Sequence, residues 1–85
     1  LQLACAFGDG SVRCNWTGTA PGAMQFLLLR SGTGPGRVFG PYPTSVNTGV
    51  DSMVVRGAIS TYLVIARDPS GRTVAHSESV NVTVP

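Results

Sequence analysis

Two cysteines on either side of an Asp-Gly dipeptide constrain the fold of this chain more than any other feature. If Cys5 and Cys14 lie opposite each other in an antiparallel pair, the numbers of all opposed residues sum to nineteen. The central turn residues are then Asp9 and Gly10, and Asp-Gly favours the type I′ turn, which needs positive φ at both positions. Since the turn plays no part in choosing the register, this agreement predicts a disulfide-closed β-hairpin over residues 3–16.

The same register gives the hairpin one apolar face, because side chains alternate along a strand. That face carries Leu3, Cys5, Phe7, Val12, Cys14 and Trp16. The opposite face carries Gln2, Ala4, Ala6, Arg13, Asn15 and Thr17. We therefore expect the first set to face a core and the second set to face solvent.

The length of the chain makes a cross-link valuable. Residues 1–85 suffice for one domain, and a chain of this size buries only ~60% of its unfolded surface. A disulfide that closes a loop of about ten residues contributes roughly 2–3 kcal/mol in the chain-entropy model. Disulfides persist in oxidising compartments, so we expect a secreted protein at an extracellular or cell-surface location.

The remainder of the chain shows the pattern of an all-β protein. Eleven glycines and six prolines separate short runs of β-branched and aliphatic residues. After the hairpin we expect strands at 23–30, 37–39, 51–56, 61–67 and 73–84, the last with a break near 76–78, and a loop or brief edge strand at 44–49. Seven short strands with turns at this spacing predict an antiparallel two-sheet sandwich.

Several of these residues resemble those of a fibronectin type III module, an immunoglobulin-like β-sandwich. The resemblance rests on Trp16 in the second strand, on the run Thr61-Tyr62-Leu63-Val64-Ile65-Ala66-Arg67, and on the turn that follows at Gly71. It implies that Trp16 packs in the core. It also implies that Tyr62, at the start of the sixth strand, anchors the connection from the fifth.

A second resemblance involves Cys14-Asn15-Trp16, with the partner cysteine one strand earlier. This arrangement is similar to the N-terminal module of class I cytokine receptors, and it implies a receptor module that binds a protein ligand. Those modules usually carry a second disulfide, whereas this chain has no cysteine after Cys14.

Apolar residues on the outer face are the candidate interface. If Phe26, Leu28, Tyr62 and Val64 point inward, then Leu27, Leu29, Leu63 and Ile65 point outward. In a fibronectin type III sandwich the two strands are neighbours, so the four side chains form one apolar patch. Two alternatives stay open: residues 34–43 cover the patch, or one strand faces the other way, since a one-residue slip exchanges the faces.

The chemistry-bearing residues do not predict an enzyme. His76 is the single histidine, and its neighbours Ser77 and Glu78 alternate in direction along a strand. Asp9 and Asp68 are explained as turn formers. The glycines of 32–36 lack the lysine of a phosphate loop, and the cysteines are better used as a bridge than as metal ligands. We expect no cofactor and no metal.

Charge and hydropathy exclude two classes of partner. The net charge is +2 and the six arginines are scattered rather than clustered, which disfavours nucleic-acid binding. No apolar run approaches 18 residues, so we expect no membrane insertion of this segment.

Two glycosylation sequons occur, at Asn15 and at Asn81. Both asparagines fall on outward positions of their expected strands. They are candidate modification sites of a surface glycoprotein.

Together these features favour a non-catalytic extracellular binding or adhesion module. It would contact a protein partner or a neighbouring domain through the outer sheet face or through loops. Two other functions stay open: a self-associating structural bead of a fibre or surface layer, and a spacer in a secreted carbohydrate-active enzyme. Since the sequence has neither an initiator methionine nor a signal peptide, we expect a mature or excised segment.

Overall fold

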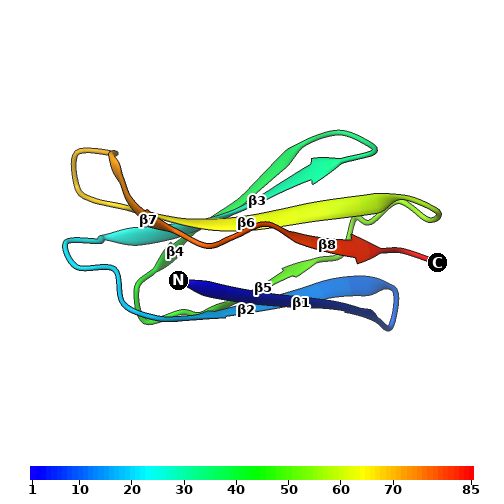
Figure 1. Cartoon of the computed structure of the whole chain (residues 1–85), viewed down its shortest axis with the longest axis horizontal. Helices are drawn as coiled ribbons and strands as arrows, with labels where there is room; N and C mark the ends of the chain where they lie inside the picture. The colour runs from blue at the N-terminus through cyan, green and yellow to red at the C-terminus, as the bar shows by residue number, and fades with distance from the viewer.

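The computed structural model describes residues 1–85 and contains eight β-strands and no helix. The strands are β1 (Gln2–Gly8), β2 (Ser11–Thr17), β3 (Gln25–Gly32), β4 (Arg37–Pro43), β5 (Thr48–Asp51), β6 (Ile59–Arg67), β7 (Thr73–His76) and β8 (Val80–Thr83). They form two antiparallel sheets that face each other (Figure 1). One sheet has the order β1-β2-β5, and the other has the order β4-β3-β6-β7, with β8 also paired to β6. The chain is the predicted all-β sandwich.

The opening hairpin has the predicted register. Cys5 lies opposite Cys14, Leu3 opposite Trp16 and Phe7 opposite Val12. The turn residues Asp9 and Gly10 have φ values of 52° and 79°, as a type I′ turn requires. A disulfide joins the two cysteines, whose Cα atoms are 4.1 Å apart.

The strand count is eight rather than seven because the predicted last strand is divided. Its break falls at residues 77–79, as expected, between β7 and β8. The cause is Ser77, which is buried and turns its hydroxyl toward β6. That hydroxyl accepts the N–H of Val64 at 3.1 Å and donates to the carbonyl of Glu78 at 2.9 Å. The Ser77 side chain thus takes the place of one backbone acceptor for β6. β7 pairs with the C-terminal part of β6, and β8 pairs with its N-terminal part.

The predicted strand at 51–56 is wrong, since β5 spans Thr48–Asp51 and residues 52–55 lie outside any strand. The strand ends because Oδ1 of Asp51 accepts the N–H of Met53 at 3.0 Å, which is an Asx-turn. Two smaller differences concern the second sheet. β3 covers Gln25–Gly32 instead of 23–30, and β4 continues past residue 39 to Pro43 with an irregularity in its pairing.

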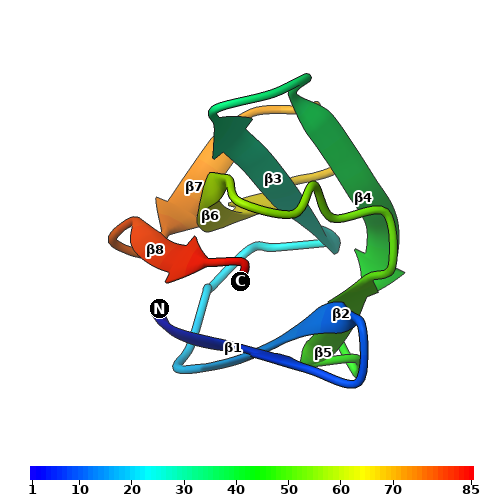
Figure 2. The ribbon, with the colours of Figure 1, turned by 90° about the vertical axis from the view of Figure 1, so that its right-hand side faces the viewer.

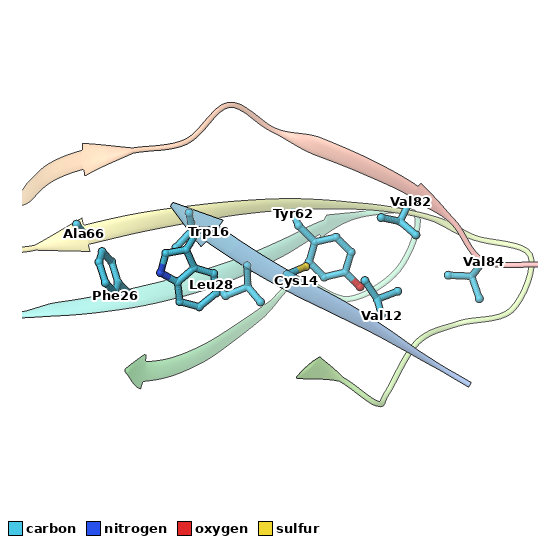
Figure 3. Close-up of a cluster of buried hydrophobic side chains, with 10 residues drawn as sticks. Val12, Cys14, Trp16, Phe26, Leu28, Tyr62, Ala66, Val82 and Val84 are labelled. Atoms are coloured by element: carbon cyan, nitrogen blue, oxygen red, sulfur yellow. The ribbon is translucent and has the colours of Figure 1, made fainter. Parts of the chain in front are cut away.

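The core lies between the sheets and extends along the sandwich (Figure 3). Its fully packed members are Val12, Cys14, Trp16, Phe26, Leu28, Tyr62, Val64, Ala66, Val82 and Val84. Trp16 contacts Phe26 and Tyr42, each with 5.7 Å between ring centroids. The predicted core position of Trp16 is therefore confirmed.

The two sides of the sandwich differ. On one side β4 descends from its sheet toward β5 in the other layer, whereas on the opposite side the N-terminus lies below β8 (Figure 2). No helix of the chain is long and apolar enough to cross a membrane.

Candidate functional site

A buried polar network of three side chains joins the two sheets. Arg30 comes from β3, Asp51 from the end of β5, and Tyr62 from β6. Nη1 of Arg30 donates to Oδ2 of Asp51 at 2.8 Å, and the Tyr62 hydroxyl donates to the same oxygen at 2.7 Å. Tyr62 therefore does link β6 to the preceding strand, and its partner is a carboxylate.

The same arginine fixes two loops at one end of the sandwich. Nη1 of Arg30 also donates to the carbonyl of Met53 at 2.9 Å, and Nη2 donates to the carbonyl of Pro35 at 3.1 Å. Pro35 lies between β3 and β4, and Met53 lies between β5 and β6. One guanidinium thus holds a carboxylate and two loop carbonyls, which satisfies most of its donors.

The network changes the acid–base behaviour of its members. Burial by itself raises the pKa of Asp51, but the hydrogen bonds from Tyr62, Arg30 and the Met53 amide, together with the charge of Arg30, outweigh it. The net result is a lowered pKa, so Asp51 stays ionised. Burial, followed by the hydrogen bond to this carboxylate, raises the pKa of Tyr62 well above its usual range.

The geometry of this network suits a structural role. The Arg30 and Asp51 side chains are almost completely buried, and both oxygens of the carboxylate already accept hydrogen bonds. A general base must reach the proton that it removes from a substrate, and this carboxylate faces other side chains of the core.

The remaining chemistry-bearing residues lie apart. His76 and Glu78 are exposed, whereas the Ser77 between them is buried, which is the alternation expected from the sequence. Asp68 caps its own turn: hydrogen bonds from the Ser70 side chain and the Arg72 amide lower the pKa of its carboxyl. No group of three or more histidine, cysteine or acidic side chains gathers where it could hold a metal ion.

Sequence reasoning placed Tyr62 in a structural role but missed Arg30 and Asp51. A signal was present, because Arg30 shares the inward parity of Phe26 and Leu28 on β3. A charged side chain at a core position needs a buried partner. The pattern did not identify Asp51 as that partner, because the expected strand began at Asp51 instead of ending there.

The four outer-face residues predicted as an interface do lie together. In the pairing of β3 with β6, Leu27 is opposite Ile65 and Leu29 is opposite Leu63. None of the four belongs to the hydrophobic cluster between the two sheets or packs against that cluster. The neighbouring strands and the predicted facing are therefore both present.

Their exposure differs from the expectation. Leu27 is only 6% exposed and Ile65 only 8%, whereas Leu29 and Leu63 are half-buried. β3 and β6 are the inner strands of their sheet, with β4 and β7 on either side, and Ile65 lies opposite His76 of β7. The expectation of an open patch over all four residues is wrong.

The accessible part of this face lies nearer the β4 edge. Val38 on β4 is opposite Leu29 and is 63% exposed, the largest exposure of any large apolar side chain in the chain. We call the row Val38, Leu29 and Leu63 the outer apolar row. Sequence reasoning did not include Val38, because the short strand expected at 37–39 had no assigned neighbour.

Both sequon asparagines are exposed. Asn15 lies on β2, and Asn81 lies on β8, where its Oδ1 accepts the Thr61 hydroxyl at 2.8 Å. Their glycosylation stays a prediction.

Comparison with known proteins supports the architecture. The sequence matches no protein family and no curated protein. Among solved structures, an Fn3-like protein from Clostridium thermocellum is similar over 98% of this chain and 88% of its own, with 22% identity and a TM-score of 0.73. The fold is fibronectin type III-like.

A second solved structure carries the same fibronectin type III-like sandwich within a larger chain. It is the pectate lyase PelI from Erwinia chrysanthemi, in complex with tetragalacturonic acid. The similarity covers 94% of the present chain but 27% of the enzyme chain, with 14% identity and a TM-score of 0.78. The resemblance of Cys14-Asn15-Trp16 to class I cytokine receptors is not confirmed by these matches.

Proposed function

We propose that this chain is a non-catalytic extracellular module that binds a protein partner or a neighbouring domain through the outer apolar row. The observation that carries the proposal is the exposure of Val38 beside Leu29, on a sheet face that has its own apolar centre at Leu27 and Ile65. Apolar surface of this kind is stabilised when a partner removes it from water. The disulfide supports the extracellular part of the proposal.

The hydrogen bonds of the acidic side chains support the proposal that the module is non-catalytic. Asp51 is committed to the buried network, and Asp68 to its turn. The aromatic side chains are committed to packing in the same way. Three of the six belong to the core and the other three pack against it: Trp16, Phe26 and Tyr62, then Phe7, Phe39 and Tyr42.

Substitution of Val38 by aspartate tests the proposal. Val50→Asp is the matched control, since Val50 is also an exposed valine on a strand at the edge of its sheet, but in the other layer. The natural protein would be isolated from the extracellular fraction in three forms: wild type, Val38→Asp and Val50→Asp. The amount of any stoichiometrically bound protein, or the association of the neighbouring domain, would be measured for each.

We expect Val38→Asp to weaken this association at least tenfold while Val50→Asp leaves it unchanged, because only the first places a charge in the interface. Unfolding curves of both variants establish that the chain is folded. Equal losses with the two variants, or a loss with neither, would contradict the proposed docking face. Recovery of the protein only from the cell interior would contradict the proposed location.

A second candidate function is that of a spacer module in a secreted enzyme that acts on polysaccharides. It is favoured by the pectate lyase, in which a sandwich similar to 94% of this chain occupies about a quarter of an enzyme. If this candidate is right, the gene encodes a catalytic domain next to these residues. Removal of the module should then lower activity on polymeric substrate and leave activity on a short soluble oligosaccharide unchanged.

A further inference from the structure

One strand edge of the sandwich lacks the features that normally prevent edge-to-edge association. β1 is seven residues long, stands at the edge of its sheet, and contains no proline and no charged residue. The other edges are protected: β5, β7 and β8 have four residues each, and β4 contains Pro41 and Pro43. Long edges without charge or proline are the ones that pair with another chain.

The register of the hairpin identifies which backbone groups of β1 are free. Gly8 and Ser11 flank the two-residue turn and form a hydrogen-bonded pair, so Cys5 and Cys14 form a non-hydrogen-bonded pair. Their Cα separation of 4.1 Å agrees, since such pairs lie about 4.5 Å apart and hydrogen-bonded pairs about 5.5 Å apart. The N–H and C=O groups of Leu3, Cys5 and Phe7 therefore point away from β2, to an edge on which no strand pairs.

The side chains beside this edge are incompletely covered. Leu3, Cys5 and Phe7 face inward but are only half-buried, whereas their partners Trp16, Cys14 and Val12 on β2 are buried. A groove of about 550 Å³ separates the start of β1 from β8, on the side where Figure 2 shows the N-terminus below β8. Its lining consists of Leu1, Gln2, Leu3, Glu78, Ser79 and Val80.

We propose that two copies of this chain associate through β1, as an antiparallel pair with Cys5 opposite Cys5 of the second copy. Opposed residue numbers then sum to ten, so that Leu3 lies opposite Phe7 of the second copy. The occupant is a second copy because the edge is self-complementary: its apolar positions are symmetric about Cys5, and its outward positions Ala4 and Ala6 are small and uncharged. The two-fold axis makes the interface isologous and closed.

The proposed pairing engages the free backbone groups of β1 and covers its half-buried side chains. The outward backbone groups of Leu3, Cys5 and Phe7 in each copy hydrogen-bond across the axis, and the first sheet continues from one copy into the other. The Phe7 ring of the second copy lies beside Leu3, where the groove between Leu1 and Val80 is open. The proposal concerns a different surface from the outer apolar row and does not depend on it.

The predicted register can be tested with charges on the outward face. In the pair, residue 4 lies opposite residue 6 of the second copy. Ala4→Glu with Ala6→Glu places like charges opposite each other twice, whereas Ala4→Lys with Ala6→Glu places opposite charges there. Both double variants carry a glutamate at position 6, opposite Arg13 within the copy, and position 4 is opposite the uncharged Asn15 in both. The two variants differ only in the side chain at position 4, which shares a face of β1 with position 6 of the same copy. Unfolding curves of both therefore establish that each monomer is folded before association is compared.

Sedimentation equilibrium of the wild type and both double variants at low salt is the experiment. We expect a monomer–dimer equilibrium for the wild type, a dissociation constant raised roughly tenfold or more by Ala4→Glu with Ala6→Glu, and recovery with Ala4→Lys and Ala6→Glu. At dimerising concentrations, amide exchange should slow at Leu3, Cys5 and Phe7. A wild type that remains monomeric up to ~1 mM would overturn the proposal, and so would a dimer that responds equally to the two double variants.

Discussion

At the scale of single residues, the buried network explains where the charged side chains of this small domain are used. Asp51 receives hydrogen bonds from Arg30, from Tyr62 and from the Met53 amide, and it belongs to a different sheet from the first two. A buried ion pair contributes little compared with a well-packed apolar replacement, because desolvation offsets its attraction. Removal of one partner is costly, however, since it leaves the other charge buried and unpaired.

The pH dependence of folding should report on Asp51. Its pKa is lowered in the folded chain, so it contributes stability that is present above the unfolded pKa of about 4 and is lost as pH falls through the folded value. In Asp51→Asn we expect lower stability at neutral pH and a weaker loss between about pH 5 and about pH 2, measured by urea unfolding. Some dependence should remain, because the pKa of Asp68 is also lowered.

Asp9→Asn is the control for this experiment, since Asp9 is exposed in the hairpin turn and asparagine suits a type I′ turn. It should retain the acid dependence of the wild type. If Asp51→Asn and the wild type lose stability in parallel as the pH falls, the network does not hold Asp51 ionised.

The two tyrosines provide a second residue-scale prediction. Tyr62→Phe removes the hydrogen bond to the Asp51 carboxylate and should lower the unfolding free energy by roughly 1.5–3 kcal/mol, the usual range for hydrogen bonds to charged groups. Tyr42 also packs against the core, but its hydroxyl donates no comparable bond. Tyr42→Phe should therefore change stability by less than about 0.5 kcal/mol. Equal effects of the two substitutions in chemical unfolding would show that the hydroxyl of Tyr62 is dispensable.

At the scale of elements, the opening hairpin could be predicted because all its determinants are local. The two cysteines, the Asp9-Gly10 turn and the alternating pattern lie within residues 3–16 and agree on one register. The break at Ser77 was also visible locally. The burial of Asp51 at the end of β5 was not, because it depends on contacts with Arg30, 21 residues away, and with Tyr62, 11 residues away.

On the outer face of the second sheet, the exposure of side chains could not be predicted from local sequence either. Alternation along β3 and β6 correctly indicated that Leu27 and Ile65 face away from the core. Their burial could not be predicted from alternation, because both lie on inner strands of a sheet whose neighbours come from distant parts of the sequence. The pattern of residues predicted only 37–39 for β4, whereas that strand has seven residues. Val38 is exposed on it, which is why the mutational test of docking belongs at Val38 and not at Leu27.

A further prediction concerns the stability that the disulfide contributes. Since it closes a short loop, replacement of Cys5 and Cys14 by alanine should lower the unfolding free energy by roughly 2–3 kcal/mol. Alanine is preferable to serine at the fully buried Cys14, because it introduces no hydroxyl into the core. Association through the outer apolar row should persist in the folded fraction. Loss of association at unchanged stability would instead give the cysteines a direct functional role.

At the scale of the whole molecule, the fibronectin type III-like sandwich separates stabilising interactions from surfaces available to partners. The disulfide cross-links the two strands of the first hairpin. The Arg30 network joins the two sheets and holds two loops at one end of the sandwich. The outer apolar row lies on the outside of the second sheet, and the β1 edge lies on the side away from β4. The outer apolar row does not contribute to the core, whereas at the β1 edge the side chains of Leu3, Cys5 and Phe7 pack against it and the outward backbone groups stay free.

The central claim is that the outer apolar row is covered in the natural protein. Hydroxyl-radical footprinting tests it even when the partner is unidentified. Oxidation of Val38 and Val50 would be measured by mass spectrometry in the isolated chain and in the natural extracellular assembly. We predict that Val38 loses at least half of its reactivity in the assembly while Val50 keeps its own. Equal reactivity of Val38 in the two samples would contradict the account.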